Sequence, residues 1–471
     1  MFSRDTYLQR REQLRRQVHS GVILLLGNED SPMNYAENPY SFRQDSSFLY
    51  FFGLDKPGLT TLIDLDEGTE TVFGDDLTID EIVWTGPQAT LHEMCLRVGV
   101  SKTGPSSELG PTVEKARQQG RTVHFLPQYR PENTVKISRL LDIEPARVQD
   151  HVSQALIRAI VAQRSIKSPE EVEQIEAALE IAREMQIAAM EHAKPGIYEK
   201  DIAGFMEGIA VSKGVRLAFP TIFSIHGETL HNHSHDNLMQ EGDIAVNDSG
   251  AESGLHYASD ITRTIPIGGR FSGQQREIYQ IVLKAQETAI TAIKPGVEFR
   301  QVHRLACITL ASGLKDLGLI KTSPEEAVQA GAYTLFFQCG LGHMLGLDVH
   351  DMESLGEDYV GYTDKIKRKM EFGWQWLRLA KALEPGYVVT VEPGLYFIPQ
   401  LIDRWKAQRK FSAFIDYGKV EKYRSFGGIR IEDDILVTDN GCRILGSKIP
   451  KHINEIEAIT SSGSAASFLW R

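Results

Sequence analysis

The sequence predicts a two-domain protein that combines α-helices and β-strands. Its 471 residues exceed what one ordinary hydrophobic core supports, so two domains are expected. Apolar, strand-like runs at 22–27 and 60–65 alternate with helical segments in the first third of the chain. A strong helix start follows residue 167. We therefore predict an α/β amino-terminal domain over residues 1–166 and a second domain over residues 167–471.

The predicted boundary carries a helix-capping sequence. Ser168 can cap the helix, Pro169 suits its first turn, and Glu171 completes a capping box. Apolar residues then recur at helical spacing, at positions 172, 175, 179 and 182. A long amphipathic helix is expected from this point.

The second domain contains a short internal repeat. The segment Lys-Pro-Gly-Ile at 194–197 recurs as Lys-Pro-Gly-Val at 294–297, and each copy lies between two apparent helices. The recurrence indicates a duplicated, helix-rich half, although a common helix-ending tripeptide can also recur by chance.

The composition narrows the class of protein. An apolar content of 42% and a charged content of 24% are typical of soluble globular proteins. The net charge of −12 argues against nucleic acid or an anionic membrane as a partner. We expect a cytoplasmic protein, because the sequence shows no signal peptide and no membrane-spanning apolar run. The four cysteines are far apart and indicate neither a disulfide framework nor a zinc knuckle. From about residue 460 a small, polar, loose tail is expected.

Five metal-ligand side chains are distributed along the second domain. They are Asp248, Asp260, His343, Glu392 and Glu432, and each lies in or beside an apolar or glycine-rich segment. Taken singly, each could be a turn residue, a strand end or a solvated side chain. Together, four carboxylates and one imidazole form an oxygen-rich set that suits two adjacent divalent ions better than one.

In this order and with these flanking residues, the five segments resemble the pita-bread metallopeptidases. The closest likeness is to the aminopeptidase P and prolidase branch, which acts on Xaa-Pro bonds, and residues 42–53 resemble the first domain of that branch. The resemblance implies a creatinase/aminopeptidase-P-type α/β domain followed by a pita-bread α+β catalytic domain. The pseudo-two-fold symmetry of that fold fits the internal repeat.

The resemblance also implies two divalent ions, with manganese first and cobalt, zinc or iron as alternatives. Asp260 and Glu432 would bridge the ions, Asp248 would complete one site, and His343 and Glu392 the other. Two ions about 3.5–4 Å apart can share a hydroxide that attacks the peptide carbonyl. Glu392 could also accept the proton of the attacking water.

Three further residues correspond to substrate or supporting positions of the family. His231 and His350 would donate hydrogen bonds to charge that develops in the transition state. Arg430, two residues before Glu432 on an expected strand, would orient a carboxylate ligand. The alternating histidines at 231, 233 and 235 would share a face if they formed a strand and could mimic a zinc site, but only His231 lies on a family motif.

The chain departs from the family pattern at three places. Asp248 and Asp260 are one residue further apart than usual, which a longer turn at 253–256 would absorb. Cys339 stands where the family has histidine. A long segment follows Asp351, as in prolidases, and Arg378 falls where their dipeptide-carboxylate-binding arginine lies. The alternative for Arg378 is an exposed helix arginine.

The expected activity is hydrolysis of the Xaa-Pro bond at the amino terminus of short peptides. Arg378 slightly favours dipeptides, and aminopeptidase P activity on longer Xaa-Pro-Yaa peptides is the near alternative. The sequence leaves room for three rival classes, namely a metal-free binding scaffold, a methionine aminopeptidase and a creatinase-like hydrolase. Relatives of this kind form homodimers or homotetramers, so either assembly is expected. The identity of the metal and the residue preferred before proline stay open.

Overall fold

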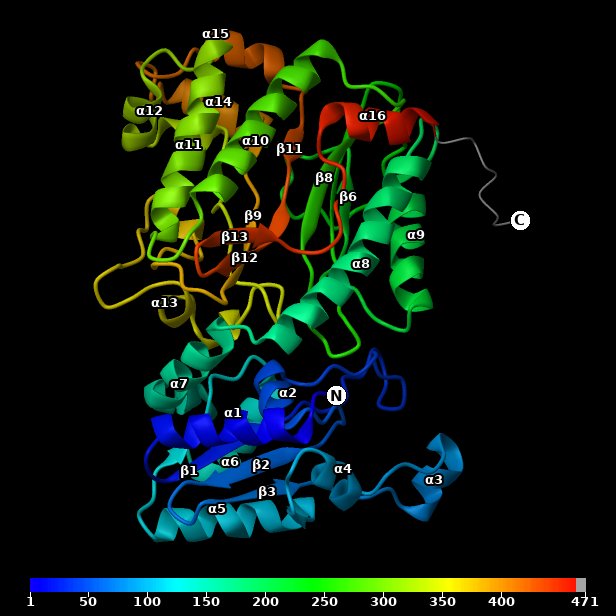
Figure 1. Ribbon diagram of the computed structural model, residues 1–471, viewed down its shortest axis with the longest axis vertical. Coiled ribbons are helices and arrows are strands. Elements are labelled where there is room, and N and C mark those ends of the chain that lie inside the picture. The colour runs from blue at the N-terminus through cyan, green and yellow to red at the C-terminus, as the bar shows by residue number, and fades with distance from the viewer. Residues whose placement is uncertain (463–471) are drawn as a thin grey trace. The chain divides into compact units, whose positions relative to one another are not determined.

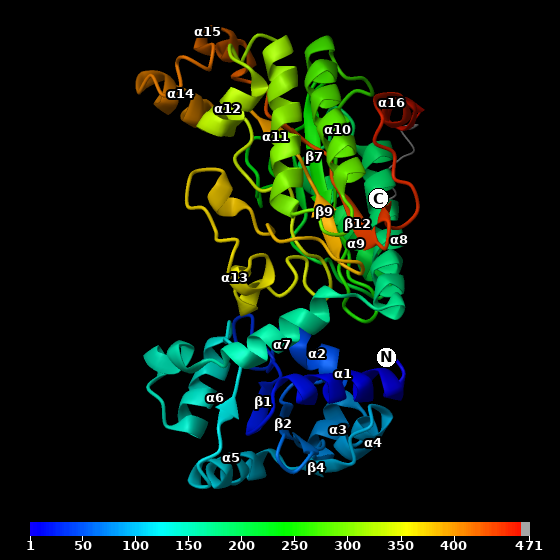
Figure 2. The same cartoon turned by 60° about the vertical axis from the view of Figure 1, so that its left-hand side comes forward.

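The computed structural model describes residues 1–462, which divide into two compact units. The first unit comprises residues 1–164 and 354–359. The second comprises residues 165–353 and the chain from residue 360 onward. Figure 1 and Figure 2 show the elements of each unit from two directions.

The first unit is built on a mixed five-stranded sheet. Its strand order is β4-β3-β2-β1-β5. The strands are β1 (Val22–Leu26), β2 (Thr60–Asp64), β3 (Thr69–Phe73), β4 (Lys102–Gly104) and β5 (Val123–His124). β1 pairs antiparallel with β2 and parallel with β5. The strands predicted at 22–27 and 60–65 are therefore confirmed as β1 and β2.

Helices cover this sheet, which lies between α1 and α5 in both views (Figure 1, Figure 2). They are α1 (Arg4–Gln17), α2 (Ser46–Phe52), α3 (Ile79–Thr85), α4 (Leu91–Arg97), α5 (Leu109–Gln118), α6 (Pro131–Leu141) and α7 (Gln154–Ser165), with 3-10 turns η1 (Ser106–Glu108) and η2 (Pro145–His151). Asp45 caps α2 by accepting the N–H of Phe48 at 2.9 Å. Gly53, with a φ of 60°, ends it. The segment 42–53 therefore contains a capped, buried helix over residues 46–52.

The second unit opens with the predicted helix α8 (Pro169–His192). Ser168 Oγ accepts the N–H of Glu171, and the Glu171 carboxylate accepts the N–H of Ser168 at 3.0 Å. The capping box predicted at this position is confirmed.

Two helix pairs follow one another in the second unit. α8 packs against α9 (Glu199–Ser212), and α10 (Gly273–Ala292) packs against α11 (Phe299–Asp316). The loop inside each pair is one copy of the repeated Lys-Pro-Gly sequence. Figure 1 shows the two pairs side by side over the strands of this unit.

The two repeat loops make equivalent hydrogen bonds. Gly196 donates its N–H to Met239 O at 2.9 Å, and Gly296 donates its N–H to Leu383 O at 2.8 Å. Both glycines have positive φ values, 86° and 82°. The return bonds are also equivalent, from Met239 N–H to Ile197 O and from Leu383 N–H to Val297 O. The repeat is therefore structural rather than a chance recurrence, as the pseudo-two-fold symmetry requires.

Three small antiparallel sheets lie under the helix pairs. They are β6 (Ile222–Ser224), β7 (Ile244–Ser249) and β8 (Ile261–Pro266); β9 (Val388–Val391), β12 (Asp433–Thr438) and β13 (Gly441–Ile444); and β10 (Gly394–Tyr396) with β11 (Gly428–Arg430). α8 and α9 pack on the first sheet, whereas α10 packs on strands of the other two. Each half thus supplies one helix pair and its own strands to a shared core.

Shorter helices complete the described chain. They are α12 (Pro324–Ala330), α13 (Glu357–Val360), α14 (Pro399–Ala407), α15 (Tyr417–Val420) and α16 (Ile453–Ser462), with 3-10 turns η3 (Ala332–Leu335), η4 (Glu353–Leu355), η5 (Trp374–Trp376) and η6 (Glu421–Tyr423). α16 continues through Ser462, so the predicted loose tail is wrong for 460–462, where helical hydrogen bonding continues. Positions 463–471 of that tail lie outside the described residues. Within residues 1–462, no helix combines the length and apolar character needed to cross a membrane.

Candidate metal centre

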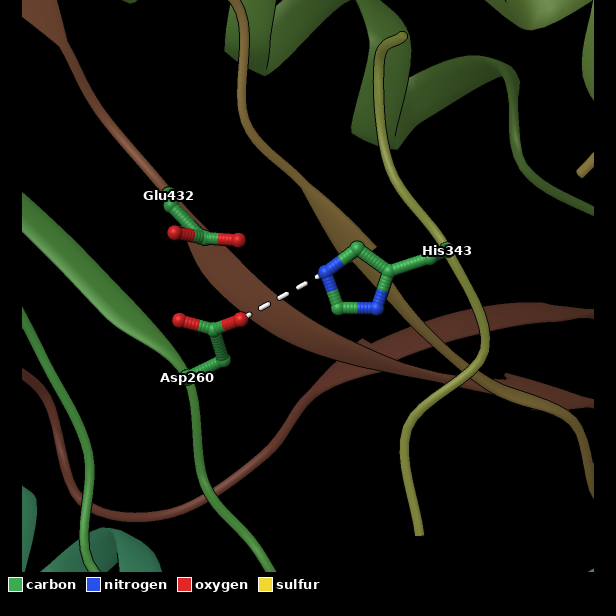
Figure 3. A group of neighbouring side chains, drawn as sticks. All are labelled: Asp260, His343 and Glu432. Atoms are coloured by element: carbon green, nitrogen blue, oxygen red, sulfur yellow. Dashed lines mark ion pairs between the residues drawn. The ribbon is translucent and has the colours of Figure 1, made fainter. Parts of the chain in front are cut away.

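Three of the five predicted ligands converge on one point. Asp260, His343 and Glu432 offer ligand atoms that all lie within 4.8 Å of one another. His343 Nε2 is 3.4 Å from Asp260 Oδ2, and the head groups point toward a common centre (Figure 3). All three side chains are buried. The structure therefore forms a small acidic centre from segments far apart in the sequence.

The other two predicted ligands border this centre. Glu392 Oε1 lies 3.7 Å from His343 Nε2. Asp248 lies within β7, directly opposite Thr262 of β8, and its charge contributes to raising the pKa of Asp260. All five residues predicted as ligands are thus brought into one region of the second unit.

Backbone pairing positions His343 beside Glu392. Residues 341–345 run along β9, where Glu392 N–H donates to Leu341 O at 2.8 Å and Thr390 N–H donates to His343 O at 3.0 Å. A Cβ on Gly342 would lie 2.0 Å from Thr390 O, so only glycine permits this approach.

The predicted turn between β7 and β8 is present. Ser253 donates its N–H to Tyr257 O at 2.8 Å, and His256 adopts a φ of 66°. Asp260 is fixed through its N–H, which donates to Asp434 Oδ2 at 3.0 Å. Asp434 was not predicted from the sequence.

The acidic centre disfavours ionisation of its own carboxyl groups. Burial, reinforced by neighbouring carboxylates, raises the pKa values of Asp260 and Glu432 well above the ordinary range. Burial also raises the pKa of Glu392, against the opposing effect of His343. Burial lowers the pKa of His343. A divalent cation would offset the repulsion among these groups.

Unpaired oxygen atoms support a cation at this place. Asp248 Oδ1, Asp260 Oδ1 and Glu432 Oε1 are buried and have no hydrogen-bond partner. Such atoms are costly unless something satisfies them. His343 Nδ1 lies 3.0 Å from Met344 O, so Nδ1 carries the proton and the Nε2 lone pair faces Asp260. The donor set fits hard or borderline divalent ions.

Arg430 orients two of the carboxylates, but not as predicted. β11 ends at Arg430 and β12 begins at Asp433, so Glu432 lies between strands and the expected shared strand is wrong. Residues 431 and 432 connect the β10–β11 sheet to the sheet that contains β12. Arg430 Nη2 donates to Asp248 Oδ2, and its Nε donates to Thr262 Oγ1, which in turn donates to Glu432 Oε2 at 2.7 Å. Thr262, two residues after Asp260, was not identified from the sequence.

The predicted substrate histidines lie near the centre. The His350 ring packs edge-on against His343, with ring centroids 4.3 Å apart. Burial and His343 lower the pKa of His350 to about 4. Burial and Arg430 lower the pKa of His231. The strand assumed for the histidines at 231, 233 and 235 does not form, because this segment is turn and irregular chain, so the alternating-face argument for a zinc triad is wrong.

Arg378 follows the 3-10 turn η5 and does not lie on a helix face. Its Nη1 is 2.8 Å from Glu353 Oε1, and the other Glu353 oxygen is 2.7 Å from His350 Nδ1. Glu353 was not predicted from the sequence. Its position three residues after His350 allows the two side chains to meet within a tight turn.

Cys339, the residue predicted to replace a family histidine, is a partly buried free thiol. Burial raises its pKa to about 12, with a further contribution from Glu392. It therefore brings neither an imidazole nor a thiolate to the centre.

A buried ion pair anchors the loop that carries His350. Lys167 Nζ lies 2.9 Å from Asp351 Oδ2, and both side chains are 1% exposed. Asp351 N–H donates to Met344 O at 2.9 Å, next to His343. Lys167 precedes its partner by 184 residues, so the sequence offered no local signal for the pair.

Two models of known protein families match this chain. Residues 173–439 match the model of metallopeptidase family M24, and residues 7–124 match the aminopeptidase P N-terminal domain. The human Xaa-Pro dipeptidase is 31% identical over 95% of this chain and 90% of its own length. The Escherichia coli Xaa-Pro aminopeptidase is 30% identical over 97% of this chain and 98% of its own length.

Solved structures are similar over nearly the whole chain. The aminopeptidase PepP of Pseudomonas aeruginosa has a TM-score of 0.80 at 26% identity, with 98% of this chain and 99% of that one covered. A zinc-substituted Escherichia coli aminopeptidase P in complex with product has the same TM-score at 30% identity and the same coverage. The chain belongs to metallopeptidase family M24, in the aminopeptidase P and prolidase branch of the pita-bread metallopeptidases. The family and fold class predicted from the sequence are confirmed.

Breaking the buried ion pair should destabilise the protein strongly. Lys167→Met removes the cation that balances the buried Asp351 carboxylate, which costs about 3–5 kcal/mol. Differential scanning calorimetry should show a clear fall in Tm. Lys213→Met is the matched control, because Lys213 pairs with Glu184 at the surface, where such pairs contribute at most about 1 kcal/mol. Equal, small shifts in both variants would contradict the anchoring role.

The metal-free protein should lose stability as the pH rises. Because the folded-state pKa values of Asp260 and Glu432 are raised, their stabilising contribution is complete at low pH and is lost as the pH rises through those values. Tm of chelator-treated protein should therefore fall above about pH 4.5, the ordinary carboxyl range. Asp260→Asn should flatten that decline. Parallel Tm profiles for the two proteins would refute the repulsion argument.

Proposed function

We propose that this chain is a dinuclear metalloexopeptidase that hydrolyses the bond between an amino-terminal residue and proline. The observation that carries the proposal is the buried group of carboxylates with unpaired oxygens in a member of family M24. Its relatives named Xaa-Pro dipeptidase and Xaa-Pro aminopeptidase support the substrate class.

The arrangement of the five side chains supports two ion positions. Asp260 and Glu432 lie at the middle and would be shared by both ions. His343 Nε2 lies between Asp260 and Glu392, at 3.4 and 3.7 Å, which supports one position formed with Glu392. Asp248 would complete the other. Manganese is our first choice, and cobalt, zinc and iron suit the same donors.

When bound, two divalent ions lower the pKa of water and polarise the scissile carbonyl. Glu392 is the candidate proton acceptor, because its carboxylate borders the acidic centre, 3.7 Å from His343 Nε2. Arg430 holds Asp248 directly and Glu432 through Thr262, so the carboxylates keep their places as charge changes.

His350 and His231 would stabilise charge on the reacting carbonyl. His350 Nδ1 already bonds to Glu353, so only Nε2 is left to face substrate. On the neutral ring Nε2 would accept a hydrogen bond. Donation from Nε2 would require the imidazolium, which burial disfavours and the Glu353 carboxylate would partly offset. His231 would take the second position.

Arg378 would bind the free carboxylate of an Xaa-Pro dipeptide, which supports a slight preference for dipeptides. Aminopeptidase P activity on Xaa-Pro-Yaa peptides is the near alternative. A catalytically inactive binding scaffold is the alternative from another class, and the presence of all five ligand residues weighs against it. We also propose a cytoplasmic homodimer or homotetramer, with the domain boundary between residues 166 and 167.

Removing a shared ligand should abolish both metal binding and turnover. Asp260→Ala should lower kcat/KM by about 1000-fold, since metal catalysis contributes several kcal/mol and each 1.36 kcal/mol is tenfold. Elemental analysis should find less metal in the purified variant. Glu207→Ala, on the exposed face of α9, is the matched control and should match the unmodified protein. Full activity of Asp260→Ala would rule out the two-ion mechanism.

Metal-restored cleavage tests the substrate class. Chelator-stripped protein reloaded with Mn²⁺ should cleave an Xaa-Pro dipeptide and an Xaa-Pro-Yaa tripeptide, but not their Xaa-Ala counterparts, as followed by product chromatography. Cleavage of the dipeptide alone would identify a dipeptidase, and cleavage mainly of the tripeptide an aminopeptidase P. No cleavage with any of the four metals would favour the binding scaffold.

A further inference from the structure

We propose that Glu353 is a positioning and selectivity residue, which fixes His350 and offsets the charge of Arg378 so that the site accepts longer peptides as well as dipeptides. This inference rests on the proposed Xaa-Pro peptidase function. Its basis is the contact of one carboxylate with both groups.

The two oxygens of Glu353 have separate partners. Oε2 lies 2.7 Å from His350 Nδ1, and Oε1 lies 2.8 Å from Arg378 Nη1. The backbone fixes this arrangement, because Glu353 N–H donates to His350 O at 3.1 Å and the turn η4 begins at Glu353. The hydrogen bond from His350, followed by the charge of Arg378, lowers the pKa of Glu353 to about 2. Glu353 is therefore a carboxylate, which can only accept hydrogen bonds.

Glu353 determines which nitrogen of His350 faces substrate. Because a carboxylate cannot donate, the proton on the neutral ring must lie on Nδ1. The ring also packs edge-on against His343, so Glu353 and His343 together set its orientation. A glutamine at position 353 can donate as well as accept a hydrogen bond, so either nitrogen of His350 could then carry the proton.

Glu353 also changes how Arg378 attracts a substrate. Two opposite charges 2.8 Å apart cancel at a distance, so a peptide carboxylate approaching Arg378 also meets the negative charge of Glu353. A dipeptide carries such a carboxylate beside its proline, whereas a longer peptide has a neutral amide there. Glu353 thus weakens the preference for dipeptides over longer peptides that Arg378 alone would give.

The contact between Glu353 and Arg378 contributes little to folding stability. The Glu353 side chain is 44% exposed and that of Arg378 is 25% exposed. Ion pairs with this much solvent contribute little to folding stability. Substitution of Glu353 should therefore change substrate selection while Tm stays nearly constant.

The test compares an Xaa-Pro dipeptide with the same dipeptide amidated at its carboxyl end, using the metal-loaded full chain. Glu353→Gln should lower KM for the dipeptide about fivefold, the size of one partly exposed charge interaction, and leave KM for the amide unchanged. It should lower kcat about tenfold for both, because His350 loses its partner. Arg378→Ala should instead raise KM for the dipeptide alone.

Two variants act as controls for charge and for length of side chain. Asp364→Asn removes a carboxylate that is 83% exposed and 4.0 Å from Lys367, and it should leave both KM values unchanged. Glu353→Asp keeps the charge and should not lower KM for the dipeptide. A dipeptide-to-amide KM ratio in Glu353→Gln equal to that of the unmodified protein would overturn the proposal.

A binding measurement separates this proposal from the proposed peptidase function. Calorimetry on chelated protein compares dipeptide and amide affinity without turnover. If the unmodified protein cleaves no Xaa-Pro peptide but Glu353→Gln binds the dipeptide more tightly relative to the amide, the selectivity role stands and the peptidase function fails. Equal affinity ratios in the two proteins, or no binding of either ligand to either protein, would overturn the selectivity role.

Discussion

The second unit depends on balancing several negative charges in its interior. Burial raises the pKa values of Asp260 and Glu432, and the nearby charges of Asp248 and Glu392 raise them further. Arg430 offsets part of this charge through Asp248. The unpaired oxygens that remain indicate that a further positive charge is required, which is the property expected of a metal centre.

The duplicated architecture provides a rigid frame for these charges. Asp248 and Asp260 come from the β7–β8 hairpin of the first half, whereas Glu392 directly follows β9 and Glu432 lies between β11 and β12 in the second half. A backbone bond joins the halves at the site, since Glu432 N–H donates to Thr262 O at 3.0 Å. Hydrogen bonds from their backbone N–H groups hold Asp260, Glu392 and Glu432 in place beside the strand ends, which suits a site that must keep like charges close.

The substrate side of the site is held differently. His350 lies on a loop whose place depends on the buried Lys167–Asp351 pair, and its ring depends on the half-exposed Glu353. The Lys167–Asp351 pair contributes to folding stability. The His350–Glu353 contact instead affects the charge and orientation of a side chain near substrate. The acidic centre and the loop that carries His350 are therefore held by separate sets of contacts.

The sequence by itself determined the family, the capped start of α8, the Lys-Pro-Gly repeat and the five candidate ligands. Each is a local pattern, because capping, turns and strand ends depend on neighbouring residues. Only the tertiary structure decided that Glu432 lies between two strands, that Thr262 links it to Arg430, and that Lys167 pairs with Asp351. The partners in those contacts are far apart along the chain, and burial and charge select them only after the two halves have packed together.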